Sequence, residues 1–198
     1  MSSWLLVASL WAASANLSLL DEGSNCVAYK AQRTTFFFPG EVVGKNCDIS
    51  AQVLPEVGGL YHIEVNIPIR SFSSGKADRD EDFAKALHAE EKPEMTYRTK
   101  AMTPEQWRAL FEKANFDLEG ELQIGEKSFP LKLATKYIQG GESDAVDGMA
   151  NVKFTDFNVT PPKVIGGLVA NTKPDVELHF HLLGSRILGA DSIRLEKK

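Results

Sequence analysis

The sequence contains four histidines that could serve as metal ligands: His62, His88, His179 and His181. His179 and His181 stand two residues apart in an alternating segment, so both imidazoles lie on one face of a strand, where such a pair can chelate a metal. His62 shares this polar phase in another segment. Because these three alternate with apolar residues, we expect them to face solvent without an assured third ligand. The sequence therefore predicts no metal site.

Motifs for nucleophilic or acid–base catalysis are missing from the sequence. The serines of 73–75 lie in a predicted loop without the G-x-S-x-G elbow, and the glycines of 166–167 lack the Lys and Ser/Thr of a phosphate loop. Asp80, Glu81 and Asp82 are adjacent acids, but they stand at a predicted helix start, where the helix dipole favours them. We find no convincing acid, base or nucleophile on the inward phase of the strands, so we expect neither an enzyme nor a cofactor.

The sequence contains two cysteines, Cys26 and Cys47. An even pair in an exported protein can form a disulfide, whereas two free thiols would fit a cytosolic protein. Neither cysteine belongs to a CxxC motif, which argues against a zinc or redox site. We predict the bond, which closes a loop of about twenty residues and contributes roughly 3 kcal/mol in the chain-entropy model.

The segment 1–15 carries no charge, and its apolar run over 4–13 is too short to span a bilayer. It ends in Ala13-Ser14-Ala15, which has the small residues of a signal-peptide cleavage site. We therefore predict a secretory signal over 1–15 and one domain over 16–198. A basic start to the segment is missing, and the alternative is a buried N-terminal helix.

Composition places the chain among ordinary globular proteins. It has 198 residues, of which 43% are apolar and 25% are charged, so it can bury one sizeable core. The net charge is -5, and no basic stripe stands out. These features argue against a nucleic-acid partner, against docking to an anionic membrane and against stable membrane insertion.

Alternation of apolar and polar residues predicts about eight strands. The clearest lies over 60–72, where Tyr61, Ile63, Val65, Ile67 and Ile69 share one face. Two short helices begin with capping signals near Asp78 and Thr103. The predicted strands are 26–38, 47–54, 60–72, 94–100, 115–124, 129–138, 146–157 and 175–183.

The predicted order has no strand–helix–strand rhythm, so the sheet should be antiparallel. Eight alternating strands suit an all-β, closed, eight-stranded antiparallel barrel with one or two short helices, and a sandwich is the alternative. Such a barrel is just wide enough to be filled by side chains or to hold one slender ligand. Periodicity cannot separate these two interiors, because both give the same pattern.

A series of short motifs carries a resemblance to a known family. In chain order they are the strand end over 67–72, Ser74-Gly75, Arg79-Asp80 opening a short helix, Pro93 before Met95-Thr96-Tyr97, the strand over 120–124, and Phe154-Thr155-Asp156-Phe157 before Pro161-Pro162. In their order and spacing, residues 60–180 resemble the YceI-like family of bacterial lipocalin-like polyisoprenoid-binding proteins.

The resemblance implies a lipocalin-like barrel with a helix near one end and export to the periplasm. It implies a long apolar pocket for an isoprenoid lipid, such as a polyprenyl chain or the tail of a quinone, and it implies no catalytic residues. The competing interpretations are a filled barrel that serves as a stress or interaction module, and an enzyme that acts on an isoprenoid lipid. The sequence leaves open whether the protein forms a homodimer.

We expect the pocket wall to come from the apolar phase of the strands and from the stripe of the first helix. Arg79 and Asp80 are predicted at the rim, close to the lipid head, or else as a structural ion pair that ties the helix to the barrel. The predicted wall residues are Phe36, Phe38, Tyr61, Ile63, Val65, Ile67, Phe72, Phe83, Leu87, Met95, Tyr97, Leu118, Leu122, Leu131, Leu133, Phe154, Leu178 and Phe180.

Overall fold

The computed structural model describes residues 19–35, 38–140, 143–160, 164–165, 168–169 and 171–193. The predicted signal segment over 1–15 and Phe36 lie outside the described residues, as does the side chain of Phe38. No helix in the described ranges is long and apolar enough to cross a membrane.

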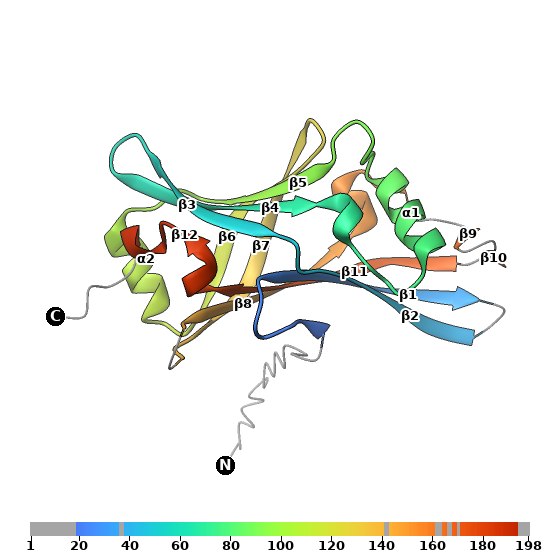
Figure 1. The fold of residues 1–198 in the computed structure, drawn as a ribbon, viewed down its shortest axis with the longest axis horizontal. Helices are drawn as coiled ribbons and strands as arrows, with labels where there is room; N and C mark the ends of the chain where they lie inside the picture. Colours follow the sequence, from blue (N-terminus) through green and yellow to red (C-terminus); the bar gives the residue numbers. More distant parts are fainter. Residues whose placement is uncertain are drawn as a thin grey trace, which may run out of the picture.

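The chain is all-β, as predicted, and its main sheet has ten strands in the order β12-β3-β4-β5-β6-β7-β8-β11-β1-β2 (Figure 1). All neighbours in this sheet pair antiparallel except β12 and β3, which are parallel. The strands are β1 (Cys26–Thr35), β2 (Phe38–Asn46), β3 (Ser50–Glu56), β4 (Leu60–Pro68), β5 (Glu94–Thr99), β6 (Asn115–Ile124), β7 (Lys127–Ile138), β8 (Ala145–Lys153), β11 (Asn171–Leu183) and β12 (Ile187–Leu188). A separate two-stranded sheet joins β9 (Val164–Ile165) to β10 (Leu168–Val169).

The prediction of eight strands was wrong, because the sequence pattern does not reveal β2 or β12. Strand β2 contains Pro39, Gly40 and Gly44 and has no apolar alternation. It forms as the partner of β1, where Tyr29 stands opposite Gly44. A Cβ atom on Gly44 would lie 2.2 Å from Cε1 of Tyr29, so only glycine accepts the ring at this point. Strand β12 has only two residues, too few for any periodic signal.

The sheet curls into a barrel-like shape, but its edges β2 and β12 are not paired with one another, which corrects the predicted closed barrel. Instead, hydrogen bonds connect β2 to the segment that follows β4, and we call this junction the seam. Lys45 and Ser73 exchange two backbone hydrogen bonds of 3.0 and 2.9 Å. The buried side chain of Asn46 donates to the carbonyl of Pro68 at 2.8 Å.

The predicted disulfide between Cys26 and Cys47 is confirmed, and the two Cα atoms lie 4.1 Å apart. Cys47 occupies the bend between β2 and β3, and fully buried Cys26 opens β1. The bond therefore fixes the start of β1 to the bend at which the chain passes from the edge strand β2 to β3, the neighbour of the opposite edge strand β12.

Helix α1 (Ala77–Ala86) lies at one end of the curled sheet and α2 (Pro104–Phe111) lies at the other (Figure 1). Helix α2 begins with the predicted capping box, in which Thr103 Oγ1 accepts from Gln106 N and Gln106 Oε1 accepts from Thr103 N. Helix α1 begins at Ala77 rather than after Asp78, and its N-cap, Lys76, makes no side-chain cap.

The predicted solvent exposure of the histidines was wrong. His179, His181 and His62 do occupy the outer phase of their strands, but each is buried. Residues 19–25 run back over β11, so that the Glu22 carbonyl lies 3.2 Å from Nε2 of His181 and Asn25 accepts a hydrogen bond from Leu183 N. In the described ranges, no group of three or more His, Cys, Asp or Glu is placed to hold a metal ion. The expectation that the purified protein carries no metal stays a prediction.

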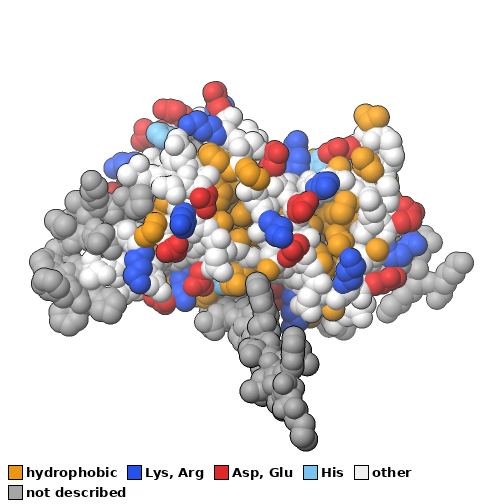
Figure 2. Space-filling view, turned by 180° about the vertical axis from the view of Figure 1, so that it is seen from behind, with side chains coloured by type: hydrophobic (Ala, Val, Ile, Leu, Met, Phe, Trp, Pro, Cys, Tyr) orange, Lys and Arg blue, Asp and Glu red, His pale blue; other side chains and the backbone are white. Residues whose placement is uncertain are grey.

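The outer face of the sheet is charged without one dominant sign. Figure 2 shows Lys and Arg side chains interspersed with Asp and Glu over the back of the molecule. Cross-strand ion pairs account for part of this pattern, including Lys132 with Asp117 at 2.7 Å and Arg98 with Glu64 at 2.6 Å. This face therefore offers no basic stripe to a nucleic acid.

Candidate ligand-binding cavity

The inner face of the sheet encloses a cavity of about 200 Å³ with an almost wholly apolar wall. A single water molecule needs only roughly 10–15 Å³ of such space and several polar partners. A cavity of this size and lining therefore suits an apolar ligand better than ordered water.

Most of the predicted wall residues lie around this cavity. They are Ile63, Val65, Ile67, Phe72, Phe83, Leu87, Met95, Tyr97, Leu118, Leu122, Leu131, Leu133, Phe154, Leu178 and Phe180. Tyr61 does not line the cavity; its backbone pairs with Met102, and its carbonyl accepts from the Trp107 indole. Whether the wall residues bind a ligand stays a prediction.

Aromatic rings on the wall lie across glycines of a neighbouring strand. Phe180 on β11 stands opposite Gly148 on β8, where a Cβ atom would fall 1.8 Å from the ring. Tyr97 on β5 covers Gly120 on β6 in the same way, with its ring 2.7 Å from the site of a Cβ atom. Glycine in a strand often marks such a close approach. Because these rings lie along the sheet, they cover the wall and leave the middle of the barrel open.

The α2 end of the cavity is closed by aromatic side chains. Trp107 is fully buried, and its indole N–H donates to the Tyr61 carbonyl at 3.0 Å. Phe111 stacks on Trp107 at 5.8 Å and on Tyr137 at 4.8 Å, and it meets Phe116 edge-on at 6.1 Å. The apolar stripe of this helix was evident in the sequence, but its place at the cavity end was not predicted.

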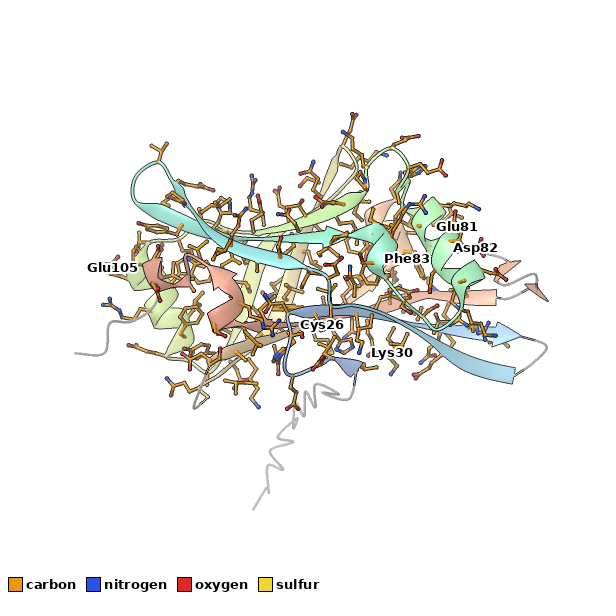
Figure 3. The ribbon with its side chains drawn as sticks, viewed as in Figure 1. Cys26, Lys30, Glu81, Asp82, Phe83 and Glu105 are labelled. Atoms are coloured by element: carbon orange, nitrogen blue, oxygen red, sulfur yellow. A yellow bond between two sulfur atoms is a disulfide. The ribbon has the colours of Figure 1, made fainter. Side chains whose placement is uncertain are left out.

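The α1 end combines an aromatic cluster with charged groups. Phe83, which is labelled with Asp82 on α1 in Figure 3, stacks on Tyr29 at 4.6 Å and packs against Phe72 at 4.9 Å. Arg79 and Asp82 reach the wall from α1. Burial, together with the carboxylate of Asp80, raises the pKa of the Tyr29 phenol to about 12, and Arg79 opposes this rise. The phenol is therefore protonated at any physiological pH.

The two predicted rim residues have different places. Arg79 lines the cavity, whereas Asp80 does not. Oδ1 of Asp80 accepts hydrogen bonds from the backbone N–H of Ser74, at 2.8 Å, and from the Ser74 hydroxyl. The ion pair that ties α1 to the rest of the fold is Glu81 with Arg70, at 3.1 Å, and Arg79 has no ion pair in the part of the chain that the structure describes.

A buried ion pair lies on the outer face of the sheet, away from the cavity. His181 Nδ1 is 2.6 Å from Oδ1 of Asp147, its neighbour across β8 and β11. The hydrogen bond to Asp147 raises the pKa of His181, and burial opposes the rise. Both ring nitrogens face acceptors, because Nε2 faces the Glu22 carbonyl, so the doubly protonated ring fits this place best.

The family model of the YceI-like domain matches residues 20–183. The chain belongs to the YceI-like family. This confirms the resemblance carried by the short motifs between residues 60 and 180 and extends it to β1, β2 and β3, which those motifs did not cover.

Solved structures share the YceI-like fold of this chain. BcnA from Burkholderia cenocepacia is 20% identical, with a TM-score of 0.57 over 79% of this chain and 95% of that chain. A polyisoprenoid binding domain from Saccharophagus degradans, implicated in plant cell wall breakdown, is 11% identical, with a TM-score of 0.57 over 79% of this chain and 92% of that one. At these identities the likeness extends to the fold alone. A comparison with curated proteins finds no match.

Proposed function

We propose that this protein binds the isoprenoid chain of a lipid inside its cavity and carries that lipid through the periplasm. The observation that carries the proposal is the open apolar cavity, which Trp107 closes at one end and which the side chains of Arg79 and Asp82 reach at the other. The fold is that of a domain from Saccharophagus degradans named for polyisoprenoid binding.

The wall offers the interactions that an isoprenoid chain needs. Burial of each CH₂ group contributes roughly 0.8 kcal/mol, so several prenyl units can outweigh the ordering cost of binding without polar contacts. Aliphatic and aromatic side chains from most strands of the main sheet surround the cavity, including Val65, Met95, Leu118, Leu133 and Phe180. We propose that the tail points toward Trp107 and the head toward α1.

The disulfide supports the proposed compartment. Disulfides form and persist in oxidising environments such as the periplasm, and they are rare in the reducing cytosol. The Cys26–Cys47 bond therefore fits an exported protein. Export through a signal over 1–15 is part of this proposal, as is the expectation that the protein carries its ligand without chemical conversion.

The test is organic extraction of the purified protein followed by mass spectrometry. We expect an isoprenoid lipid from the natural chain and from Ala134→Trp, because Ala134 is exposed on the outer face of β7. Val65→Trp places the same side chain on the cavity wall and should abolish lipid recovery while leaving the folded state intact. Absence of lipid in all three proteins, together with a loss of roughly 1–3 kcal/mol of stability from overpacking in Val65→Trp, would favour a filled barrel instead.

A further inference from the structure

We propose that the α1 end of the cavity is a head-group site that recognises acceptor oxygens, with Arg79, Arg33 and Tyr29 as the donors. This inference rests on the proposed lipid-binding function and names the chemistry of the head. A quinone carbonyl and a phosphate share that chemistry, because both present oxygen lone pairs and, when the phosphate is ionised, no hydrogen to donate.

Arg79 gives the strongest evidence. Its side chain lines the cavity, and its Nε atom is buried without a hydrogen-bond partner in the described part of the chain. A guanidinium has five N–H donors and no acceptor. Leaving a buried donor unsatisfied is costly, so an acceptor supplied by a ligand would stabilise the bound state.

Tyr29 points to the same chemistry. The stacked Phe83 and the tilted Phe72 fix the position of its ring, and burial keeps its hydroxyl protonated. No hydrogen bond of this hydroxyl is found within the described residues. Tyr97, the other tyrosine on the wall, differs because its hydroxyl donates to the Leu118 carbonyl at 3.3 Å. The hydroxyl of Tyr29 is therefore available to a ligand.

Strand β1 runs toward the α1 end of the barrel (Figure 1). Arg33 stands four residues beyond Tyr29 on this strand and adds a second guanidinium to the residues that line the cavity. Neither Arg33 nor Arg79 forms an ion pair with Asp82 or with any other acid that the structure describes. Asp80, the remaining acid nearby, is engaged by Ser74. Donors therefore outnumber free acceptors here, and a head with acceptor oxygens completes the set.

Three probes that share the same farnesyl tail separate the contribution of the head to the binding affinity from that of the tail. Farnesyl phosphate carries anionic acceptor oxygens, a farnesyl benzoquinone carries neutral ones, and β-farnesene carries no head at all. Calorimetric titration of the natural chain should give a dissociation constant at least about tenfold lower for one or both headed probes than for β-farnesene. The tighter of the two headed probes identifies the kind of head.

The variants assign the effect to named residues. Arg79→Gln should weaken binding of the preferred headed probe about tenfold and leave binding of β-farnesene unchanged. Arg108→Gln is the matched control, because Arg108 is exposed on the helix at the opposite end of the cavity. If Arg79→Gln fails to fold, Tyr29→Phe removes one hydroxyl from the same site and should weaken the same probe severalfold.

Two different failures can be distinguished. If β-farnesene and the headed probes bind equally, or if Arg79→Gln and Tyr29→Phe both behave like Arg108→Gln, the head-group site is refuted while the cavity keeps its tail-binding role. If no probe binds, β-farnesene included, the proposed function itself fails and the head-group site fails with it.

Discussion

The two ends of the barrel are built on different principles. At the α2 end, a capping box starts the helix, fully buried Trp107 fills the opening, and its indole N–H has a backbone partner. At the α1 end, the helix has no side-chain cap, and the wall carries Arg79, whose Nε lacks a partner in the described part of the chain.

We interpret the difference between the two ends as a division of roles, with stability provided at the α2 end and ligand binding at the α1 end. Satisfied polar groups and a buried aromatic residue stabilise the α2 end without any ligand. Donors that lack partners cost free energy in the free protein, and natural proteins accept such costs mainly at functional sites. The orientation that we propose, with the tail at the α2 end and the head at the α1 end, follows from this contrast and can be tested at either end.

The largest expected effect is on stability at the α2 end. Trp107→Ala should lower the free energy of unfolding by about 3–5 kcal/mol, because it removes a buried aromatic side chain and leaves a cavity. Phe83→Ala truncates a half-buried side chain on α1 and should lower the free energy of unfolding by clearly less. Denaturant unfolding of both variants makes the comparison, and equal losses would contradict the assignment of stability to the α2 end.

The disulfide should have the next largest effect, and it belongs to neither end. Replacing Cys26 and Cys47 together by Ala should lower the free energy of unfolding by about 2–4 kcal/mol, since the bond restricts the unfolded chain and fixes the start of β1 to the bend between β2 and β3. Thermal unfolding with and without reductant gives an independent measurement on the natural chain. A melting temperature that does not respond to reduction would contradict a stabilising role of the bond.

Helix capping gives a smaller, paired test. Thr103→Ala should cost about 1 kcal/mol, because it removes the acceptor of the Gln106 N–H. Lys76→Ala, at the corresponding position of α1, should leave stability unchanged within the error of measurement, because Lys76 makes no side-chain cap. Chemical denaturation distinguishes the two, and an equal loss at Lys76 would contradict the contrast between the helix starts.

The smallest expected effect is the pH dependence from the outer face. The folded state raises the pKa of His181, so its stabilising contribution is complete below the ordinary histidine pKa and is lost as the pH rises through the raised value. Asp147 faces the ring from β8, Glu22 faces it from the N-terminal segment, and Lys136 stands opposite Asp147 on β7.

Unfolding measured between pH 5 and 8, the range in which histidine ordinarily titrates, should show this decline in the natural chain. Asp147→Asn removes the carboxylate and should flatten the pH profile. An unchanged slope in that variant would assign the pH dependence to another group.

The sequence was most informative where one strand face is apolar and the other polar. The alternation around Ile63, Val65 and Ile67 predicted the inner face of β4, because period two is set by the strand itself. It was silent on β2, whose residues depend on the ring of Tyr29 on the partner strand. It was misleading for His181, because the cover over its face comes from Glu22, which lies 159 residues away in the chain.

The openness of the cavity was beyond sequence analysis for a related reason. Filled and hollow barrels share one apolar pattern, and the difference depends on where the rings lie. Gly148 is unremarkable in the sequence until Phe180 is placed across it by the pairing of β8 with β11. Long-range pairing of this kind cannot be read from local periodicity.

The most direct test of the central claim uses Trp107, the only tryptophan of a chain beginning at Asn16. A farnesyl lipid brominated at the far end of its tail, and a second one brominated beside its head, are titrated against the protein while Trp107 emission is recorded. We expect saturable quenching by the tail label and little quenching by the head label, because the tail should lie against Trp107. Stronger quenching by the head label would reverse the orientation, and no saturable quenching by either would contradict binding in the cavity.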